Sequence, residues 1–503
     1  MEKIPSFLRF YGEAVSAGKD MKTGEYMLFR DLKFDISIQK TLEKLHYTEM
    51  FPIQEKVIPI LCNKQDVIAQ SKTGSGKTAA YLLPIMQNTK WDEKEPQALI
   101  LTPTRELALQ VKEEYDNISM YQRLKCVAIF GKQPYKFQIE DLKQRTHAVV
   151  GTPGRVLDHL ERGTLSLDKI QYVILDEADE MLKMGFLETV VKIMAYFPKK
   201  YTTALFSATM PQPIMELAEK FMKEPVHIKI EDPLTDTGIH YAYEVKEQEK
   251  IPFLIQLLCK ELPQSCIVFA KTQANVIEVC DALYNKGMSV DKLHGGMLQE
   301  DRIQNIKDFK KGIFRILVAT DVAARGIDID DVTHIINYDM PNEKETYVHR
   351  KGRTGRAFGK QGVTISFLSQ YDTQRREELE EYLGYTIEIH DREEIDNMPV
   401  NEEILKRLGE NPQLKKDKAE ELRKDTCKLY INKGKSKKIR AGDIVGAICQ
   451  IEGVQSEDIG VIQVQEHQSY VDILNGKGKD VLKALNQKTI KGKKIKVEIA
   501  KEN

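Results

Sequence analysis

Residues 66–78 read DVIAQSKTGSGKT, and this stretch decides the fold of the first part of the chain. An apolar run leads into a Gly-containing turn and then a helical pattern, which is typical of a strand–loop–helix unit that binds phosphate. The strict motif has Gly where this chain has Ser71, and a plain Gly-rich turn is the alternative interpretation. We predict that these residues line a nucleotide: Ser71, Lys72, Thr73, Gly74, Ser75, Gly76, Lys77 and Thr78.

Two carboxylates follow a second buried run, YVIL at residues 172–175. In parallel sheets such positions lie at the same edge as the phosphate-binding loop. We predict that Asp176 holds a divalent metal together with the hydroxyl of Thr78, and that Glu177 orients the attacking water. Lys77 neutralises phosphate charge. An acidic helix cap is the alternative, and the pairing with the loop argues against it.

Similar apolar runs recur in two series, which predicts two doubly wound α/β domains in tandem. The first series comprises residues 66–74, 98–104, 147–153, 172–179 and 203–209, and the second comprises 266–272, 290–296, 315–321, 333–339 and 363–369. From Cys427 onward the pattern changes to βαββαβ, the order of an RNA-recognition-motif (RRM) fold. The predicted segments are an extension (1–25), two α/β domains (26–232 and 239–390), a charged helical linker (391–424) and an α+β RRM-like domain (425–503).

The composition limits the class of protein. Lys and Arg number 75 against 76 Asp and Glu, so the overall charge makes no case for nucleic acid and any basic surface must be local. The segment from Cys427 onward has about six more basic than acidic residues. The seven cysteines show no CxxC spacing, and no apolar run reaches the roughly 18 residues of a membrane span. We therefore expect a cytoplasmic protein without membrane association.

Six short motifs resemble the ordered motif set of DEAD-box RNA helicases. They are PTRELA at 103–108, TPGR at 152–155, DEAD at 176–179, SAT at 207–209, ATDVAARGID at 319–328 and HRKGRTGR at 349–356. The resemblance covers roughly residues 29 to 390. It implies two RecA-like domains and RNA-dependent hydrolysis of ATP with Mg²⁺.

The resemblance also implies how adenine is bound. Gln54 would read the adenine edge, because an amide offers both a donor and an acceptor, and Phe29 would stack on the base. The chain departs from the family pattern nearby, with His46 in place of Gly and Met50-Phe51 in place of Pro-Thr. The family's Gly-Gly pair is likewise interrupted by Lys132.

Roles in the second domain follow from the same resemblance. Arg353 and Arg356 would reach the γ-phosphate on domain closure, since guanidinium groups bind phosphate bidentately. Asp328 would contact the nucleotide ribose or the closing interface. Three further residues would couple the two domains: Ser207, Thr209 and His349.

The RNA-binding residues implied by the resemblance contact backbone atoms, so the motor should not read sequence. They are Pro103, Thr104, Arg105, Glu106, Thr152, Gly154 and Arg155 in the first domain, and Gly295, Gly296, Gln299, Arg302, Thr320 and Asp321 in the second.

The C-terminal arrangement resembles the DbpA-like subgroup of bacterial DEAD-box proteins. This implies recognition of large-subunit (23S-type) ribosomal RNA and a role in ribosome assembly on pre-ribosomal particles, with no stable protein partner. The stronger candidate for the contact surface is a basic segment: Lys433, Lys435, Lys437, Lys438 and Arg440.

Two other functions remain open at this point. An ATP-gated RNA clamp that does not unwind would carry every one of these motifs. A DNA helicase is disfavoured by the DEAD form of the motif and by the C-terminal RNA-binding unit.

Overall fold

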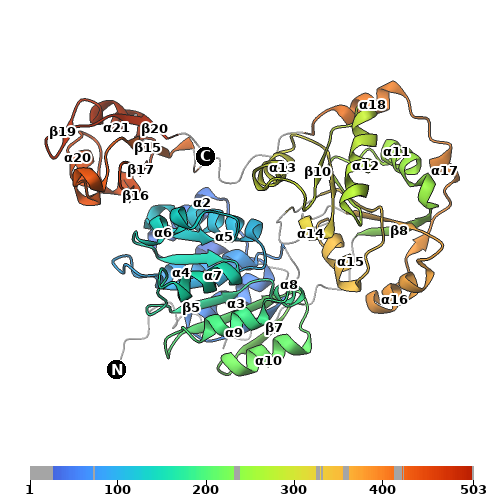
Figure 1. Ribbon diagram of the computed structural model, residues 1–503, viewed down its shortest axis with the longest axis horizontal. Coiled ribbons are helices and arrows are strands. Elements are labelled where there is room, and N and C mark those ends of the chain that lie inside the picture. Colours follow the sequence, from blue (N-terminus) through green and yellow to red (C-terminus); the bar gives the residue numbers. More distant parts are fainter. Residues whose placement is uncertain are drawn as a thin grey trace. The chain divides into compact units, whose positions relative to one another are not determined.

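The computed structural model describes residues 27–71, 74–230, 238–324, 329, 332–354, 362–412, 422 and 424–500. These residues form three main sheets and one small two-stranded sheet (Figure 1). The chain separates into two compact units, one holding the second sheet and the other the first and third sheets. The predicted extension 1–25 and residues 413–421 of the predicted linker lie outside the described residues.

The first sheet has seven parallel strands in the order β3-β4-β2-β5-β6-β1-β7. The strands are β1 (Val67–Gln70), β2 (Ala98–Leu101), β3 (Cys126–Ile129), β4 (Ala148–Gly151), β5 (Tyr172–Leu175), β6 (Thr202–Ser207) and β7 (Val226–Lys229). The helical elements are η1 (Phe29–Asp31), α2 (Ile36–Lys44), α3 (Pro52–Cys62), α4 (Lys77–Asn88), α5 (Arg105–Ile118), η2 (Met120–Gln122), α6 (Tyr135–Leu142), α7 (Pro153–Glu161), α8 (Ala178–Lys183), α9 (Leu187–Met194) and α10 (Gln212–Phe221).

Helices bury both faces of this sheet. Alternate strand residues such as Ala69 and Ile100 pack with α3, α4 and α5, whereas Ile68 and Leu99 pack with α7, α9 and α10. Because side chains of a strand alternate between faces, two-sided burial demands an apolar residue at nearly every position. This explains the continuous apolar runs and confirms the predicted doubly wound class.

The register places three motifs at one edge of the sheet. Leu175 of β5 pairs with Leu205 of β6, and Ser207 of β6 pairs with Gln70 of β1. The phosphate-binding loop, the DEAD sequence and the SAT sequence therefore leave adjacent strands at the same carboxyl edge, which is where parallel α/β sheets bind ligands. The motifs assigned to RNA follow β2 and β4, in the other half of that edge.

The second sheet repeats this design with seven parallel strands in the order β10-β11-β9-β12-β13-β8-β14. The strands are β8 (Ile239–Glu244), β9 (Cys266–Phe269), β10 (Val290–Leu293), β11 (Ile316–Ala319), β12 (His334–Asn337), β13 (Val363–Leu368) and β14 (Glu388–Ile389). The helical elements are η3 (Glu247–Glu249), α11 (Lys250–Glu261), α12 (Gln273–Asn285), α13 (Gln299–Lys311), α14 (Asp321–Ala324), α15 (Lys344–Lys351), α16 (Thr373–Leu383), α17 (Glu393–Asp396) and α18 (Glu402–Gly409).

The last two of these helices come from the segment predicted to be a linker. Ile395 of α17 and Leu408 of α18 are fully buried in the core of the second domain, together with residues of α11 and α12. The charged surface of these short helices thus covers an apolar face that packs on the motor.

The C-terminal domain has a four-stranded antiparallel sheet in the order β16-β17-β15-β20. Its elements are β15 (Cys427–Ile431), η4 (Lys435–Lys437), α20 (Ala441–Cys449), η5 (Ser456–Asp458), β16 (Ile459–Val464), β17 (Ser469–Ile473), α21 (Gly478–Leu485), β18 (Thr489–Ile490), β19 (Lys493–Lys494) and β20 (Val497–Ile499). This confirms the predicted βαββαβ order. The short hairpin β18–β19, between α21 and the last strand, was not predicted.

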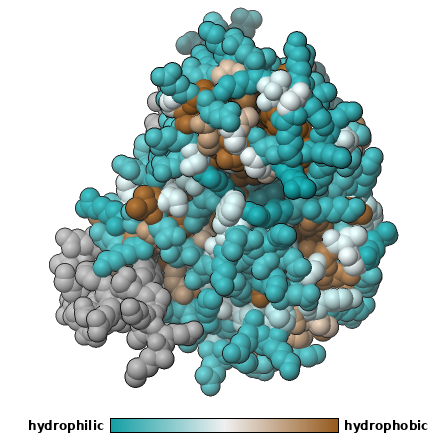
Figure 2. All heavy atoms as spheres, turned by 90° about the vertical axis from the view of Figure 1, so that its left-hand side faces the viewer, coloured by the Kyte–Doolittle hydropathy of each residue, from teal (hydrophilic) through white to brown (hydrophobic). Residues whose placement is uncertain are grey.

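The surface face drawn in Figure 2 is mainly hydrophilic, with apolar side chains in small groups. No helix in the described ranges is long and apolar enough to cross a membrane.

Candidate nucleotide and RNA sites

The phosphate-binding loop has the backbone that its glycines permit. Gly74 and Gly76 adopt left-handed conformations, with φ of 76° and 85°, and Gly76 is the N-cap of α4. A Cβ atom at Gly76 would lie 2.4 Å from Nε2 of Gln54, so the close approach requires glycine as well. Lys77 is buried, with Nζ 3.4 Å from the carbonyl of Ser71. Lys72 and Thr73 lie outside the described residues.

Gln54 links the loop to α3. Its Nε2 donates to the carbonyl of Gly76 at 3.1 Å, and its Oε1 accepts the N–H of Phe51 at 2.8 Å. The side-chain amide thereby caps α3, since Phe51 has no capping group of its own. Phe29 is buried and meets the ring of Tyr47 edge-on. The adenine contacts of Gln54 and Phe29 stay predictions.

Both predicted carboxylates of the DEAD sequence are buried. The hydroxyl of Tyr81 on α4 donates to Oδ2 of Asp176 at 2.9 Å. Burial raises the pKa of Asp176, while the charge of Lys77 and the hydrogen bond from Tyr81 act in the opposite direction. Burial and the charge of Asp176 raise the pKa of Tyr81 well above its usual value, so this hydroxyl keeps its proton. Glu177 holds a left-handed backbone with φ of 54°, a conformation that concentrates at functional sites.

The donor set fits a magnesium ion of the kind that accompanies nucleotides. No cluster of three or more His, Cys, Asp or Glu side chains able to hold a metal occurs in the described part of the chain. A nucleotide-bound Mg²⁺ needs less, because phosphate oxygens and water complete its shell around one carboxylate and one hydroxyl. Asp176 Oδ1 is buried and has no hydrogen-bond partner among the described residues, which leaves it available to such an ion.

The SAT sequence is bonded to the last residue of the DEAD sequence. Asp179 Oδ2 accepts from both the N–H and the hydroxyl of Thr209 at 3.0 Å. Ser207 accepts the N–H of Asp179 at 3.2 Å and donates to the carbonyl of Thr209 at 2.7 Å. These bonds join two strand ends within the first domain. The predicted coupling to the second domain stays a prediction.

The RNA-assigned segments of the first domain begin two helices. Thr104 is the N-cap of α5 and accepts the N–H of Leu107, and Thr152 is the N-cap of α7. Gly154 is exposed, with open space where a Cβ atom would be. Pro103 and Glu106 are buried beside these ends, and Arg105 is half-buried.

Arg155 is held inside a network that the sequence analysis missed. Its Nη1 donates to Oε1 of Gln138 at 3.0 Å and to the carbonyl of Gln133 at 2.9 Å. Gln138 in turn donates to the carbonyl of Phe130 and bonds His159 at 3.0 Å. Burial first, and then the charge of Arg155, lower the pKa of His159 to about 4. The network joins Arg155 of the 152–155 turn to the segment 130–138, and the neutral His159 is a second partner of Gln138.

In the second domain, Asp321 is bound by a residue that we did not predict. Arg350 donates to both carboxylate oxygens of Asp321, at 2.6 and 2.7 Å, and also to Asn337 Oδ1 at 2.8 Å. Arg302 reaches the carbonyl of Ala323 at 3.5 Å, and Thr320 accepts the N–H of that same residue. This group joins the segment after β11 to α15.

The remaining predicted residues of this domain lie at separate places on it or outside the described ranges. Gly295 and Gly296 are exposed just after β10, and Gln299 begins α13. His349 is half-buried on α15 and Arg353 is buried just after it. Asp328 and Arg356 lie outside the described residues.

The basic segment of the C-terminal domain forms an exposed turn. Four of its five cations are exposed: Lys435, Lys437, Lys438 and Arg440. Two lysines of the unpredicted hairpin β18–β19 donate into it, with Lys491 Nζ 3.1 Å from the carbonyl of Lys438 and Lys493 bonding the carbonyl of Lys437. The hairpin thus enlarges the basic surface. The rings of Tyr430 and Tyr470 lie together on the sheet, 5.7 Å apart.

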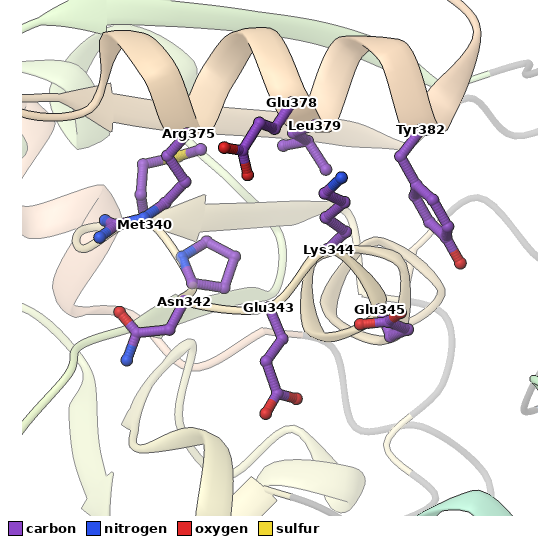
Figure 3. Close-up of a pocket in the computed structure, with 10 residues that line it drawn as sticks. Met340, Asn342, Glu343, Lys344, Glu345, Arg375, Glu378, Leu379 and Tyr382 are labelled. Atoms are coloured by element: carbon purple, nitrogen blue, oxygen red, sulfur yellow. The ribbon is translucent and has the colours of Figure 1, made fainter. Parts of the chain in front are cut away.

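A pocket of about 330 Å³ in the second domain is unrelated to these sites. Figure 3 shows Glu378 and Leu379 of α16 facing the segment that contains Glu343 and Glu345. Its lining carries three glutamates besides Lys344 and Arg375, and none of the predicted site residues lines it.

Comparison with known proteins decides the family. Residues 51–217 match the DEAD/DEAH box helicase model, residues 249–358 the helicase conserved C-terminal domain and residues 428–499 the DbpA RNA binding domain. The chain is 49% identical over 477 residues to the ATP-dependent RNA helicase DbpA of Bacillus subtilis, covering 94% of this chain and 99% of that one. The chain belongs to the DbpA-like DEAD-box RNA helicases.

Two further relatives agree with this family. The DEAD-box ATP-dependent RNA helicase CshA of Geobacillus kaustophilus is 45% identical over 68% of this chain and 73% of its own. The structure of S. cerevisiae Dbp5 bound to RNA and ADP BeF3 is 30% identical, covers 76% of this chain and all of its own, and has a TM-score of 0.67. The protein is therefore an ATP-dependent RNA helicase with two RecA-like domains and a DbpA-type RNA-binding domain, as the motifs predicted.

Proposed function

We propose that this helicase remodels structured large-subunit ribosomal RNA of the 23S type during ribosome assembly, on pre-ribosomal particles in the cytoplasm. The observation that carries the proposal is the basic surface of the C-terminal domain, where an exposed lysine-rich turn is backed by two lysines of the hairpin β18–β19. A folded domain with such a surface can bind one structured RNA element.

The two parts of the chain divide the work. The motor contacts phosphate and 2′-OH groups, which look alike in every RNA. It therefore couples ATP hydrolysis to RNA remodelling without selecting a sequence. The C-terminal domain selects the target RNA by binding it. This binding raises the local concentration of the motor at nearby duplexes. The proposed boundaries of these parts are 26–232 and 239–390 for the motor, 391–424 for the connector and 425–503 for the RNA-binding domain.

The chemistry at the first domain rests on four residues. Lys77 neutralises the phosphates and Glu177 orients the water that attacks the γ-phosphate. Thr78 and Asp176 would hold Mg²⁺, which when bound would neutralise negative charge on the phosphate oxygens.

Closure of the two domains completes the site. Arg353 and Arg356 act as fingers on the γ-phosphate, a task worth about 10³ to 10⁵ in rate in other phosphoryl-transfer enzymes. Ser207, Thr209 and His349 transmit closure to the RNA-binding edge. RNA stimulates hydrolysis because bound RNA favours the closed state.

One experiment tests the choice of target. ATP hydrolysis by the full-length protein is measured against the concentration of large-subunit ribosomal RNA and of a single strand of arbitrary sequence. We expect half-maximal activation at a much lower concentration of ribosomal RNA, and strand separation of a duplex placed beside the bound element. Equal activation by the two RNAs would refute the proposed specificity, and tight binding without strand separation would indicate the clamp.

A further inference from the structure

Tyr81 makes a contact inside the nucleotide site that none of the assigned roles explains. It lies on α4, four residues after Lys77, and its side chain is fully buried. Its hydroxyl donates to Asp176 Oδ2 across 95 positions of sequence, and its ring packs against Phe206 of β6 at 5.3 Å. A polar hydroxyl in such a core is costly unless it is bonded, so this bond determines where the hydroxyl points.

The two oxygens of Asp176 have different surroundings. Oδ2 receives the bond from Tyr81, whereas Oδ1 is buried without a partner among the described residues. The last torsion of an aspartate is broad, and a fixed hydrogen bond to one carboxylate oxygen helps to set the direction of the other. Thr78 stands three residues before Tyr81 on the same helix, so the two side chains share a face.

We propose that Tyr81 is a positioning residue of the metal site, whose hydroxyl holds Asp176 so that Oδ1 is presented to the Mg²⁺ ion bound with ATP. The inference rests on the proposed roles of Asp176 and Thr78 as metal-holding residues. Partners of metal-bound carboxylates elsewhere contribute about 10- to 100-fold to metal affinity, which sets the size of the expected effect.

The test removes one oxygen atom. Tyr81→Phe keeps the ring and its packing on Phe206 but removes the hydrogen bond to Asp176. Binding of a fluorescent ADP analogue to the full-length protein is followed while Mg²⁺ is added, which needs no turnover. We expect the Mg²⁺ concentration at half-effect to rise about 10- to 100-fold, while nucleotide binding in EDTA stays unchanged because Lys77 and the loop are intact.

The chain provides a matched control in Tyr115. This tyrosine is also fully buried in the same core, and its hydroxyl has no hydrogen-bond partner among the described residues. Tyr115→Phe therefore makes the same chemical change without touching Asp176. It should leave the Mg²⁺ titration at its original midpoint, and an equal shift in both variants would overturn the proposal as an effect of core packing.

A second reference separates this inference from the proposed metal site itself. Asp176→Asn should weaken the response to Mg²⁺ strongly. If Asp176→Asn shifts the titration and Tyr81→Phe does not, the role of Tyr81 is wrong and the metal site stands. If neither variant shifts it, the assignment of Asp176 fails, and the inference fails with it.

Discussion

Several residues with a Cβ atom hold left-handed backbone conformations, and two of them replace a glycine of the family pattern. His46 and Lys132 have φ of 57° and 60°, and both stand where the family pattern has Gly. A left-handed conformation costs a residue with a Cβ atom about 1 to 2 kcal/mol. The cost is small beside the stability of a domain, so the turn geometry persists although the glycine is lost.

The first prediction contrasts two residues of the nucleotide site. Lys77→Ala should lower ATP hydrolysis to under about a tenth of the original rate and weaken nucleotide binding, since the phosphates lose their cation. Glu177→Gln keeps the shape and the cation, so it should stop hydrolysis while ATP and RNA stay bound. Rates of hydrolysis and of RNA release in ATP distinguish the two. Release from Glu177→Gln as fast as from the original protein would contradict its assigned role.

The second prediction uses the buried His159. Its pKa in the folded state, about 4, lies below its usual value of 6.5, so the unfolded chain binds more protons between these values. The contribution of neutral His159 to the free energy of unfolding is fully present above pH 6.5. It is lost as the pH falls toward 4, and the loss is at most about 3 kcal/mol. His159→Asn should flatten this part of the pH profile.

The single tryptophan makes this measurable. Trp91 lies in the first domain, so its fluorescence during denaturant unfolding reports on that domain alone. The denaturant concentrations at the unfolding midpoint, measured at pH 7.5, 6.5 and 5.5, give the slope of stability against pH. His227→Asn changes an exposed histidine of the same domain and should leave the slope unaltered. If stability depends on pH in the same way in His159→Asn as in the original protein, the network does not disfavour protonation of His159.

At the scale of elements, nine of the ten strands predicted for the two α/β domains are central strands of their sheets, and the tenth, β10, is an edge strand with three half-buried residues. The missed strands β3, β7 and β14 are edge strands, and β8 adjoins one of them. Val226–Lys229 of β7 mixes exposed and buried residues because an edge position leaves part of the strand in solvent. Ile239–Glu244 of β8 does so too, because its outer neighbour β14 pairs with only two of its residues. A search for continuous apolar runs therefore finds central strands more readily than edge strands and their neighbours.

The site was predictable to a similar, limited extent. The residues of a motif follow one another in the sequence. The phosphate-binding loop and the DEAD sequence could therefore be recognised without a structure. Tyr81, Gln138 and Arg350 act on partners in other elements, at separations of 95, 17 and 29 residues. Only the folded chain brings such pairs together, and each residue alone resembles an ordinary core or surface residue.

The third prediction concerns the basic turn as an element. Replacing Lys435, Lys437 and Lys438 by Ala should weaken RNA binding and flatten its salt dependence, because each lost phosphate contact removes roughly 0.7 to 0.9 from the log–log slope. A slope smaller by about 2 to 3 is expected if all three contact phosphate. The control replaces Lys192, Lys199 and Lys200, exposed lysines of the first domain. Equal changes in both triple variants would mean that only overall charge matters.

At the scale of the whole molecule, charge is separated rather than uniform. The full chain has a formal net charge of −1, yet its C-terminal domain is basic. A uniformly basic helicase would bind any RNA tightly, and sequence-independent attraction would compete with the correct target. In this chain the excess of cations is confined to the C-terminal domain. If the motor does not read sequence, as proposed, the RNA bound by that domain would determine where the motor acts.

The last prediction follows from this separation. Deleting residues 425–503 removes the basic turn, the hairpin β18–β19 and the whole four-stranded sheet, but leaves every residue assigned to ATP and to the motor's RNA contacts. The truncated protein should hydrolyse ATP in response to RNA and should respond equally to large-subunit ribosomal RNA and to an arbitrary single strand. Activation curves for both RNAs, measured with full-length and truncated protein, give the comparison. A preference for ribosomal RNA that survives truncation would place specificity outside the C-terminal domain, in the motor or in the segments 1–25 and 391–424 that remain with it.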